Sequence, residues 1–269
     1  MMLINGVAQH QLDASDRAIQ FGDGCFTTAR IRRGKVVWHE AHLARLKLAC
    51  QRLMIEQTDW SQLDSEMRTL ASQQDDAVLK VIITRGAGGR GYSMAGCGLP
   101  TRILSCAPYP AHYPALRERG ARLARVSTPL GSNPVLAGLK HLNRLEQVLI
   151  RAELDAKPAD EALVLDTEGR LVECCAANLF WRKGTQLFTP DLSLCGVAGL
   201  ARQHLIQQAQ TLGWPVAYVR QTPDALSDAD EVLICNALMP LVPVIQAETY
   251  RYQSREFYHQ LTTNNDEWK

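Results

Sequence analysis

The segment 138-GLKHLNRLEQVLIRAEL-154 combines a helical pattern with one lysine that the pattern does not explain. From His141 onward, apolar residues recur at the three- and four-residue spacing of a helix: Leu142, Leu145, Val148, Leu149 and Ala152. Lys140 precedes this expected helix and follows a loop that contains proline and glycine. We therefore expect its side chain to project from a turn among apolar neighbours, where a packing role remains one interpretation.

The composition excludes several function classes. A chain of 269 residues suffices for one or two domains, and 29 Lys and Arg against 28 Asp and Glu give a net charge of +1. This balance provides no field for unspecific binding of nucleic acid or acidic lipid. No apolar run reaches the roughly 18 residues of a membrane span, and the first residues do not resemble a signal peptide. The eight cysteines form no C-x-x-C pair, so we expect reduced thiols and a cytoplasmic enzyme.

The order of the expected elements indicates an α+β fold. Asn5-Gly6 and Arg33-Gly34 are typical of tight hairpin turns, and later strands are also paired in hairpins. The expected helices cover residues 40–56, 60–73, 141–154, 199–213 and 254–263. Prolines concentrate after residue 107, which divides the chain into a small N-terminal domain, 1–108, a linker, 109–114, and a larger domain, 115–269.

A glycine-rich loop lies between two expected strands, at 77–85 and 101–109. Its Gly86-x-Gly88-x-x-Gly91 matches the dinucleotide-binding fingerprint, but the following residues do not open a helix. A flexible hairpin loop is therefore the favoured interpretation. The functional alternative is a mobile loop that carries Arg85, Arg90 and Tyr92 and closes over an anionic substrate.

The helix at 40–56 and the segment before it carry two histidines and an arginine of interest. His39 and His42 have a spacing that suits a metal, but no third ligand is nearby, so we expect cap or surface roles and no metal. Arg45 lies at the edge of the buried stripe. It is either a surface arginine with a packed stem or a guanidinium directed at a phosphate or carboxylate.

Glu173 stands in the apolar strand "RLVECC" at 170–175. Burying a lone carboxylate is costly, so this side chain needs a partner. A structural ion pair and a functional site both meet that need.

Lys140, Glu173, Arg45 and the loop "GVAGLAR" at 196–202 together resemble the fold-type IV pyridoxal phosphate enzymes. These include branched-chain and D-amino acid aminotransferases and aminodeoxychorismate lyases. The long stretches "QFGDGCFTTAR", "LAGLKHLNRLEQVLIR" and "ECCAANLFWRKG" are most similar to the lyases. The resemblance implies a small N-terminal α/β domain, a larger C-terminal domain with a β-barrel-like core, and a homodimer with its site at the junction of the two domains.

The resemblance also implies a role for each candidate cofactor residue. Lys140 would bind pyridoxal 5'-phosphate as an imine and transfer protons, and Glu173 would keep the pyridine nitrogen protonated. Arg45 would bind the phosphate, aided by backbone N–H groups of the 196–198 turn. The other residues that match segments bordering the cofactor in relatives are Asn178, Val197, Ala198, Asn236 and Ala237. Aminotransferases of this fold have threonines where this chain has Ala198 and Ala237.

The candidate substrate residues lie near the N-terminus. Phe26, Thr28 and Arg30 share one face of a strand and match pocket positions in relatives, although an ordinary exposed strand face has the same composition. The substrate that the resemblance implies, 4-amino-4-deoxychorismate, carries two carboxylates, so Arg30 and Arg90 are candidate anion partners.

The implied reaction is elimination of pyruvate to give 4-aminobenzoate, in folate biosynthesis, with no nucleic-acid or membrane partner. A D-amino acid or branched-chain aminotransferase that uses the same Lys140 and Glu173 is the nearest alternative. A non-catalytic binding module is a third, which an imine-forming lysine does not favour.

Overall fold

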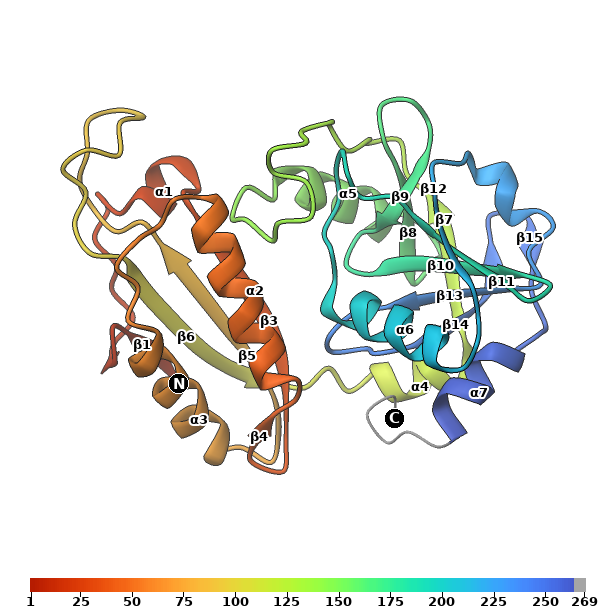
Figure 1. Cartoon of the computed structure of the whole chain (residues 1–269), viewed down its shortest axis with the longest axis horizontal. Coiled ribbons are helices and arrows are strands. Elements are labelled where there is room, and N and C mark those ends of the chain that lie inside the picture. The colour runs from red at the N-terminus through yellow and green to blue at the C-terminus, as the bar shows by residue number, and fades with distance from the viewer. Residues whose placement is uncertain (264–269) are drawn as a thin grey trace. The chain divides into compact units, whose positions relative to one another are not determined.

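The computed structural model describes residues 1–263 and forms two compact units (Figure 1). The first unit contains Met1–Pro110 and Leu139–Asn143, and the second contains Ala111–Gly138 and the chain from Arg144 onward. The chain first leaves the first unit between Pro110 and Ala111, inside the expected linker. It returns for Leu139–Asn143, which the division by sequence had placed in the larger domain.

An antiparallel sheet forms the first unit, in the order β2-β1-β6-β5-β3-β4. Asn5 and Gly6 both have positive φ, as do Arg33 and Gly34, so both expected hairpin turns are confirmed. The strands are β1 (Met2–Ile4), β2 (Val7–Ala8), β3 (Gly24–Arg32), β4 (Lys35–Val36), β5 (Asp76–Thr84) and β6 (Thr101–Pro108).

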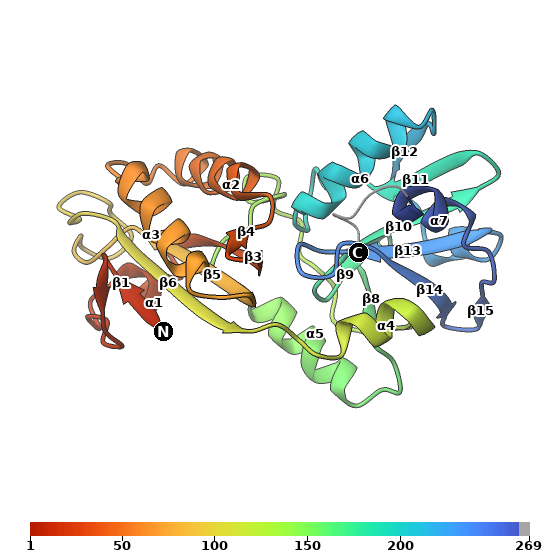
Figure 2. The ribbon, with the colours of Figure 1, turned by 90° about the horizontal axis from the view of Figure 1, so that it is seen from below.

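Helices α2 (His39–Arg52) and α3 (Trp60–Ser72) cover one face of this sheet, as Figures 1 and 2 show, and both confirm expected helices. Because the helices cover one face, the side chains of β3 alternate between buried and partly exposed positions. Those that face the helices are buried: Cys25, Thr27, Ala29 and Ile31. Those on the other face are partly exposed, among them Phe26, Thr28 and Arg30. The expectation that these three share one face is confirmed.

The two histidines near the start of α2 have different environments. His42 is fully buried, and its Nδ1 lies 2.6 Å from the Thr27 hydroxyl. The expected cap or surface role for His42 is therefore wrong, because this position belongs to the helix face that packs on β3. His39 is partly exposed, and its Nε2 lies 2.5 Å from Asp64 Oδ1.

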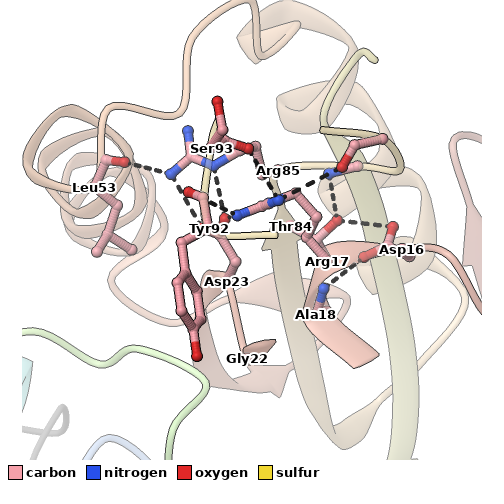
Figure 3. Close-up of polar contacts among 12 residues, drawn as sticks. Asp16, Arg17, Ala18, Gly22, Asp23, Leu53, Thr84, Arg85, Tyr92 and Ser93 are labelled. Carbon is pink, nitrogen blue, oxygen red and sulfur yellow. Dashed lines mark hydrogen bonds and ion pairs between the residues drawn. The ribbon is translucent and has the colours of Figure 1, made fainter. Parts of the chain in front are cut away.

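A network of charged side chains ties the short helix α1 (Arg17–Phe21) to the end of β5 (Figure 3). Asp23 accepts hydrogen bonds from Arg17 at 2.8 Å and from Arg85 at 2.7 and 3.0 Å. Arg85 also donates to the carbonyls of Leu53 and Met54. The expectation that Arg85 rides on a mobile loop is wrong, because its guanidinium is buried and bonded on all sides.

The same network fixes the glycine-rich loop of residues 86–100. Arg17 donates to the carbonyls of Gly91 at 3.0 Å and Ser93 at 3.2 Å, as seen for Ser93 in Figure 3. Gly86 has a φ of 84°, and a Cβ there would lie 2.1 Å from the carbonyl oxygen of Leu99. Turns rather than a helix follow Gly91. The glycines thus serve the path of the loop, and the dinucleotide fingerprint is coincidental.

The second unit is built on a mixed sheet in the order β12-β11-β10-β13-β14-β7-β8-β9, with β15 paired to β14. The sheet curls, since β9 at one end also contacts β10 and β11, and this confirms the expected barrel-like core. The strands are β7 (Ala121–Arg125), β8 (Glu161–Leu165), β9 (Leu171–Cys174), β10 (Asn178–Lys183), β11 (Gln186–Pro190), β12 (Val216–Val219), β13 (Glu231–Cys235), β14 (Val242–Ala247) and β15 (Tyr250–Arg251).

The helices of the second unit are α4 (Tyr113–Arg119), α5 (Leu145–Asp155), α6 (Leu200–Thr211) and α7 (Glu256–Thr263), with a 3-10 turn η1 at Pro223–Leu226. The last two α-helices were expected, whereas α4 occupies part of the expected linker and continues beyond it. Proline is compatible with its first turn, because the N–H it lacks has no helical acceptor there. No helix within residues 1–263 has the length and apolar character to span a membrane.

Helix α5 differs from its expected form in two ways. It begins at Leu145 rather than His141, and its apolar stripe is exposed: the exposed fractions are 77% for Leu145, 59% for Val148 and 58% for Leu149. Ile150 and Leu154 form its buried contacts instead. The spacing of these apolar residues was helical, but the residues lie on the exposed face of the helix.

We predict that Asp23→Asn lowers the free energy of unfolding of the first unit by about 3–5 kcal/mol, because it leaves two buried guanidinium groups without their carboxylate. Denaturant titration measures the change. The matched control is Glu40→Gln, which removes an exposed ion pair with Arg68 in the same unit and should cost less than about 1 kcal/mol. Equal losses in the two variants would contradict the prediction.

Candidate active site

Strand β3 holds the backbone of Lys140 in the first unit. The Phe26 N–H donates to the Lys140 carbonyl at 2.9 Å, and the Leu142 N–H donates to the Gly24 carbonyl at 3.0 Å. Between these bonds, His141 pairs with Cys25 as an isolated bridge. The segment is therefore extended, because pairing with the strand replaces the helical bonds that its spacing suggested. The Lys140 ammonium lies 4.6 Å from the centroid of the Phe26 ring, on the partly exposed face of the sheet.

The other candidate substrate residues occupy different surroundings. Thr28 and Arg30 follow Phe26 on the same face, but the Arg30 guanidinium is already paired with both oxygens of Asp76, at 3.0 and 3.1 Å. The Arg30 guanidinium carbon also lies 4.0 Å from the centroid of the Tyr109 ring. Arg90 is exposed in the 86–100 loop.

Arg45 lies on α2, between the buried His42 and Leu46, and is itself partly exposed. Burial lowers the pKa of the Arg45 guanidinium to about 10, so the group remains charged at neutral pH in a desolvated position. An anion beside it would offset that desolvation, and the planar guanidinium matches phosphate geometry.

Glu173 lies on β9 in the second unit and is only 5% exposed. Its Oε2 accepts the Val197 N–H at 2.8 Å. Gly196 has a φ of 83°, and a Cβ there would lie 2.8 Å from Val172 Cγ1 and 3.2 Å from Glu173 Oε2. The turn before α6 therefore packs directly on this carboxylate, and it needs a glycine to do so.

The start of α6 is fixed by Asn178. Its side-chain N–H donates to the Val197 carbonyl at 2.9 Å, and its oxygen accepts the Gly199 N–H at 3.1 Å. A Cβ on Gly199 would lie 2.0 Å from that oxygen, so a larger residue there would displace the amide. Asn178 thus positions the helix terminus.

Two N–H groups of the 196–198 turn have acceptors within the second unit. The Val197 N–H is bonded to Glu173, and the Ala198 N–H donates to the Gly138 carbonyl at 3.1 Å. Both N–H groups thus have acceptors from distant parts of the chain in this structure, and their part in binding the phosphate stays a prediction. Donors that lack helical acceptors follow in the first turn of α6, from Leu200 to Arg202.

Asn236 shapes the turn that contains Ala237. Its side-chain oxygen accepts the N–H groups of Leu238 at 2.9 Å and Met239 at 2.7 Å. Its amide N–H donates to the Ala176 carbonyl at 3.0 Å. The side chain therefore ties this turn to the loop between β9 and β10, close in sequence to Glu173.

Arg144 is a charged residue of this region that lies within the helix expected at residues 141–154. It occupies the N-cap position of α5, and burial lowers the pKa of its guanidinium, while the charges of Glu173 and Glu146 act in the opposite direction. The sequence did not distinguish Arg144 from other charged helix residues, because the expected helix included it. The observed helix starts at Leu145, one residue after Arg144, and leaves Arg144 at its N-cap.

A sequence model of the amino-transferase class IV family matches residues 24–247. The chain belongs to the class IV aminotransferase family. The matched part contains Arg45, Lys140 and Glu173, and it extends from the start of β3 to the end of β14.

Class IV relatives of known name are similar along nearly the whole chain. An aminodeoxychorismate lyase of Vibrio harveyi is 39% identical, over 91% of this chain and 90% of the relative. A putative branched-chain-amino-acid aminotransferase of Methanocaldococcus jannaschii is 31% identical, over 91% and 87%. The crystal structure of 4-amino-4-deoxychorismate lyase from Pseudomonas aeruginosa has a TM-score of 0.92 at 38% identity, over 99% of this chain and all of that one. The two-domain architecture of fold-type IV enzymes is thereby confirmed.

Proposed function

We propose that this protein is a pyridoxal phosphate-dependent lyase that converts 4-amino-4-deoxychorismate into 4-aminobenzoate and pyruvate. The observation that carries the proposal is similarity along nearly the full chain to two lyases of this name, at higher identity than to the aminotransferase relative. The reaction would supply 4-aminobenzoate to folate biosynthesis.

The residues of this chain fit the cofactor. Pyridoxal phosphate needs an amine for its aldehyde, an acid beside its pyridine nitrogen and a cation for its phosphate. Lys140, Glu173 and Arg45 supply these three groups. The buried Glu173 carboxylate needs hydrogen-bond donors, of which the Val197 N–H is one and a protonated pyridine nitrogen would be another. The desolvated Arg45 guanidinium would likewise gain from an anion.

Each group then has a defined part in the elimination. When bound, pyridoxal phosphate supplies an electron sink that stabilises negative charge next to the substrate amine. The Nζ of Lys140 takes the proton from the amine-bearing carbon, and Glu173 holds a proton at the pyridine nitrogen. Cleavage of the ring carbon–oxygen bond releases enolpyruvate, whose methylene carbon takes up a proton to give pyruvate. The ring that remains is aromatic, which makes the elimination favourable. Backbone pairing with β3 keeps Lys140 in place throughout.

We predict that the protein loaded with pyridoxal phosphate releases 4-aminobenzoate and pyruvate in equal amounts from 4-amino-4-deoxychorismate. Lys140→Ala should slow this release at least roughly 100-fold, because the proton-transferring amine is lost. The control Lys157→Ala, at an exposed position of the second unit, should retain the wild-type rate. Chromatography of the products measures both.

The alternative is a class IV aminotransferase, favoured by the similarity to the branched-chain relative. It is tested in the same preparation with an amino acid and a 2-oxo acid. Amino-group transfer at a substantial rate, with no 4-aminobenzoate formed from 4-amino-4-deoxychorismate, would contradict the lyase proposal.

We also propose that the protein is a cytoplasmic homodimer, as its resemblance to fold-type IV enzymes implies. Helix α5 supports the dimer, since it exposes Leu145, Val148 and Leu149 on one face. A second copy of the chain would remove this apolar surface from water, which is the main driving force of association.

We predict that Leu149→Asp converts the dimer into a monomer in sedimentation experiments, because a carboxylate would be buried in an apolar contact. The matched control is Leu212→Asp, an exposed leucine at the end of α6, which should leave the dimer intact. A wild-type monomer, or a Leu149→Asp dimer of unchanged stability, would refute the assignment of this face.

A further inference from the structure

A second lysine shares the Phe26 ring with Lys140 in the first unit. Lys80 of β5 pairs with Thr28 of β3, and its Nζ lies 5.3 Å from the centroid of the Phe26 ring. The Lys140 Nζ lies 4.6 Å from the same centroid. The two nitrogens are therefore no farther apart than the sum of these distances, about 10 Å.

Lys80 and Arg30 are both cations on this face, but their partners differ. Arg30 makes two hydrogen bonds to Asp76 and stacks on Tyr109. Lys80 is exposed, and within residues 1–263 no carboxylate forms an ion pair with it. An anion that reaches this face would therefore find the ammonium of Lys80 available, whereas the guanidinium of Arg30 would first have to leave Asp76.

The spacing of the two lysines suits an amine and a carboxylate on one ring. Lys140 is bonded to β3 at Phe26, which pairs with Ile82, and Lys80 is the next residue of β5 on the same face. Such a step along a strand is about 7 Å. In an aromatic or cyclohexadiene ring, an amine and the carboxylate opposite it are roughly 6 Å apart, from ordinary bond lengths.

We propose that Lys80 binds the ring carboxylate opposite the substrate amine and so directs the amine toward Lys140, with the ring beside Phe26. This inference rests on the proposed lyase function and identifies the residue that recognises its substrate. It transfers to Lys80 the role that the sequence analysis gave to Arg30. The partly exposed face of the sheet would thus recognise both ends of a 4-amino acid ring, with the carboxylate at Lys80 and the amine near Lys140.

The kinetic test uses the holoenzyme and three variants. Lys80→Met should raise KM for 4-amino-4-deoxychorismate about 10- to 100-fold, the usual effect of losing a charged hydrogen bond, with a much smaller change in kcat. Lys80→Arg should restore most of the loss, because it keeps the charge. The matched control is Lys47→Met, which removes an exposed lysine of α2 whose Nζ lies 5.8 Å from the centroid of the Trp60 ring on α3, and it should leave KM unchanged.

A binding test separates recognition of the carboxylate from an effect on the scaffold. By calorimetry, Lys80→Met should bind 4-aminobenzoate about 10- to 100-fold more weakly than the wild type, and it should bind aniline, which lacks the carboxylate, equally well. The visible absorption of the bound cofactor should be the same in both proteins.

The outcomes distinguish the inference from the proposed function. An active wild type whose KM and 4-aminobenzoate affinity are unchanged by Lys80→Met would overturn the inference alone. Equal weakening of aniline and 4-aminobenzoate would also overturn it, since the effect would not involve the carboxylate. A wild type that forms no 4-aminobenzoate would instead remove the proposed function, and the inference with it.

Discussion

Two backbone hydrogen bonds, from the Phe26 N–H to the Lys140 carbonyl and from the Leu142 N–H to the Gly24 carbonyl, determine where the central lysine stands. Without them, the helical spacing after residue 140 would extend α5 toward Lys140. With them, the segment Leu139–Asn143 belongs to the first unit and is extended, and the lysine lies on the open face of a sheet. The Phe26 ring, and the second ammonium beside it, become relevant only because of this placement.

Local chemistry allowed much of the fold to be predicted from the sequence. Asn5-Gly6 specified its turn because both residues accept positive φ, and α2 and α3 followed from the spacing of apolar residues. Secondary structure was predicted less well where hydrogen bonds from distant residues compete with the local spacing of apolar residues. The start of α5 moved to Leu145 because β3 supplies hydrogen bonds to the preceding residues. Its exposed stripe shows that periodicity identifies an apolar face but not what covers it.

The candidate site likewise has residues that could be predicted from the sequence and residues that could not. Glu173 could be singled out because a carboxylate in an apolar strand needs a partner, and its family then suggested which one. The acceptors of the Val197 and Ala198 N–H groups could not be predicted, because they lie 24 and 60 residues away in the chain. Lys80 was overlooked because a lysine on the exposed face of a strand is usually an ordinary solvated residue. Its significance depends on register with β3, which only the structure reveals.

Reduction of the pyridoxal phosphate-loaded protein with borohydride, followed by mass spectrometry of its peptides, tests most directly whether this placement makes Lys140 the cofactor lysine. The reduced bond is permanent, so the modified peptide identifies the amine that held the cofactor. The account predicts that the added mass lies on Lys140 and is absent from the peptide that contains Lys80. Modification of Lys80 or of another lysine in place of Lys140 would contradict it.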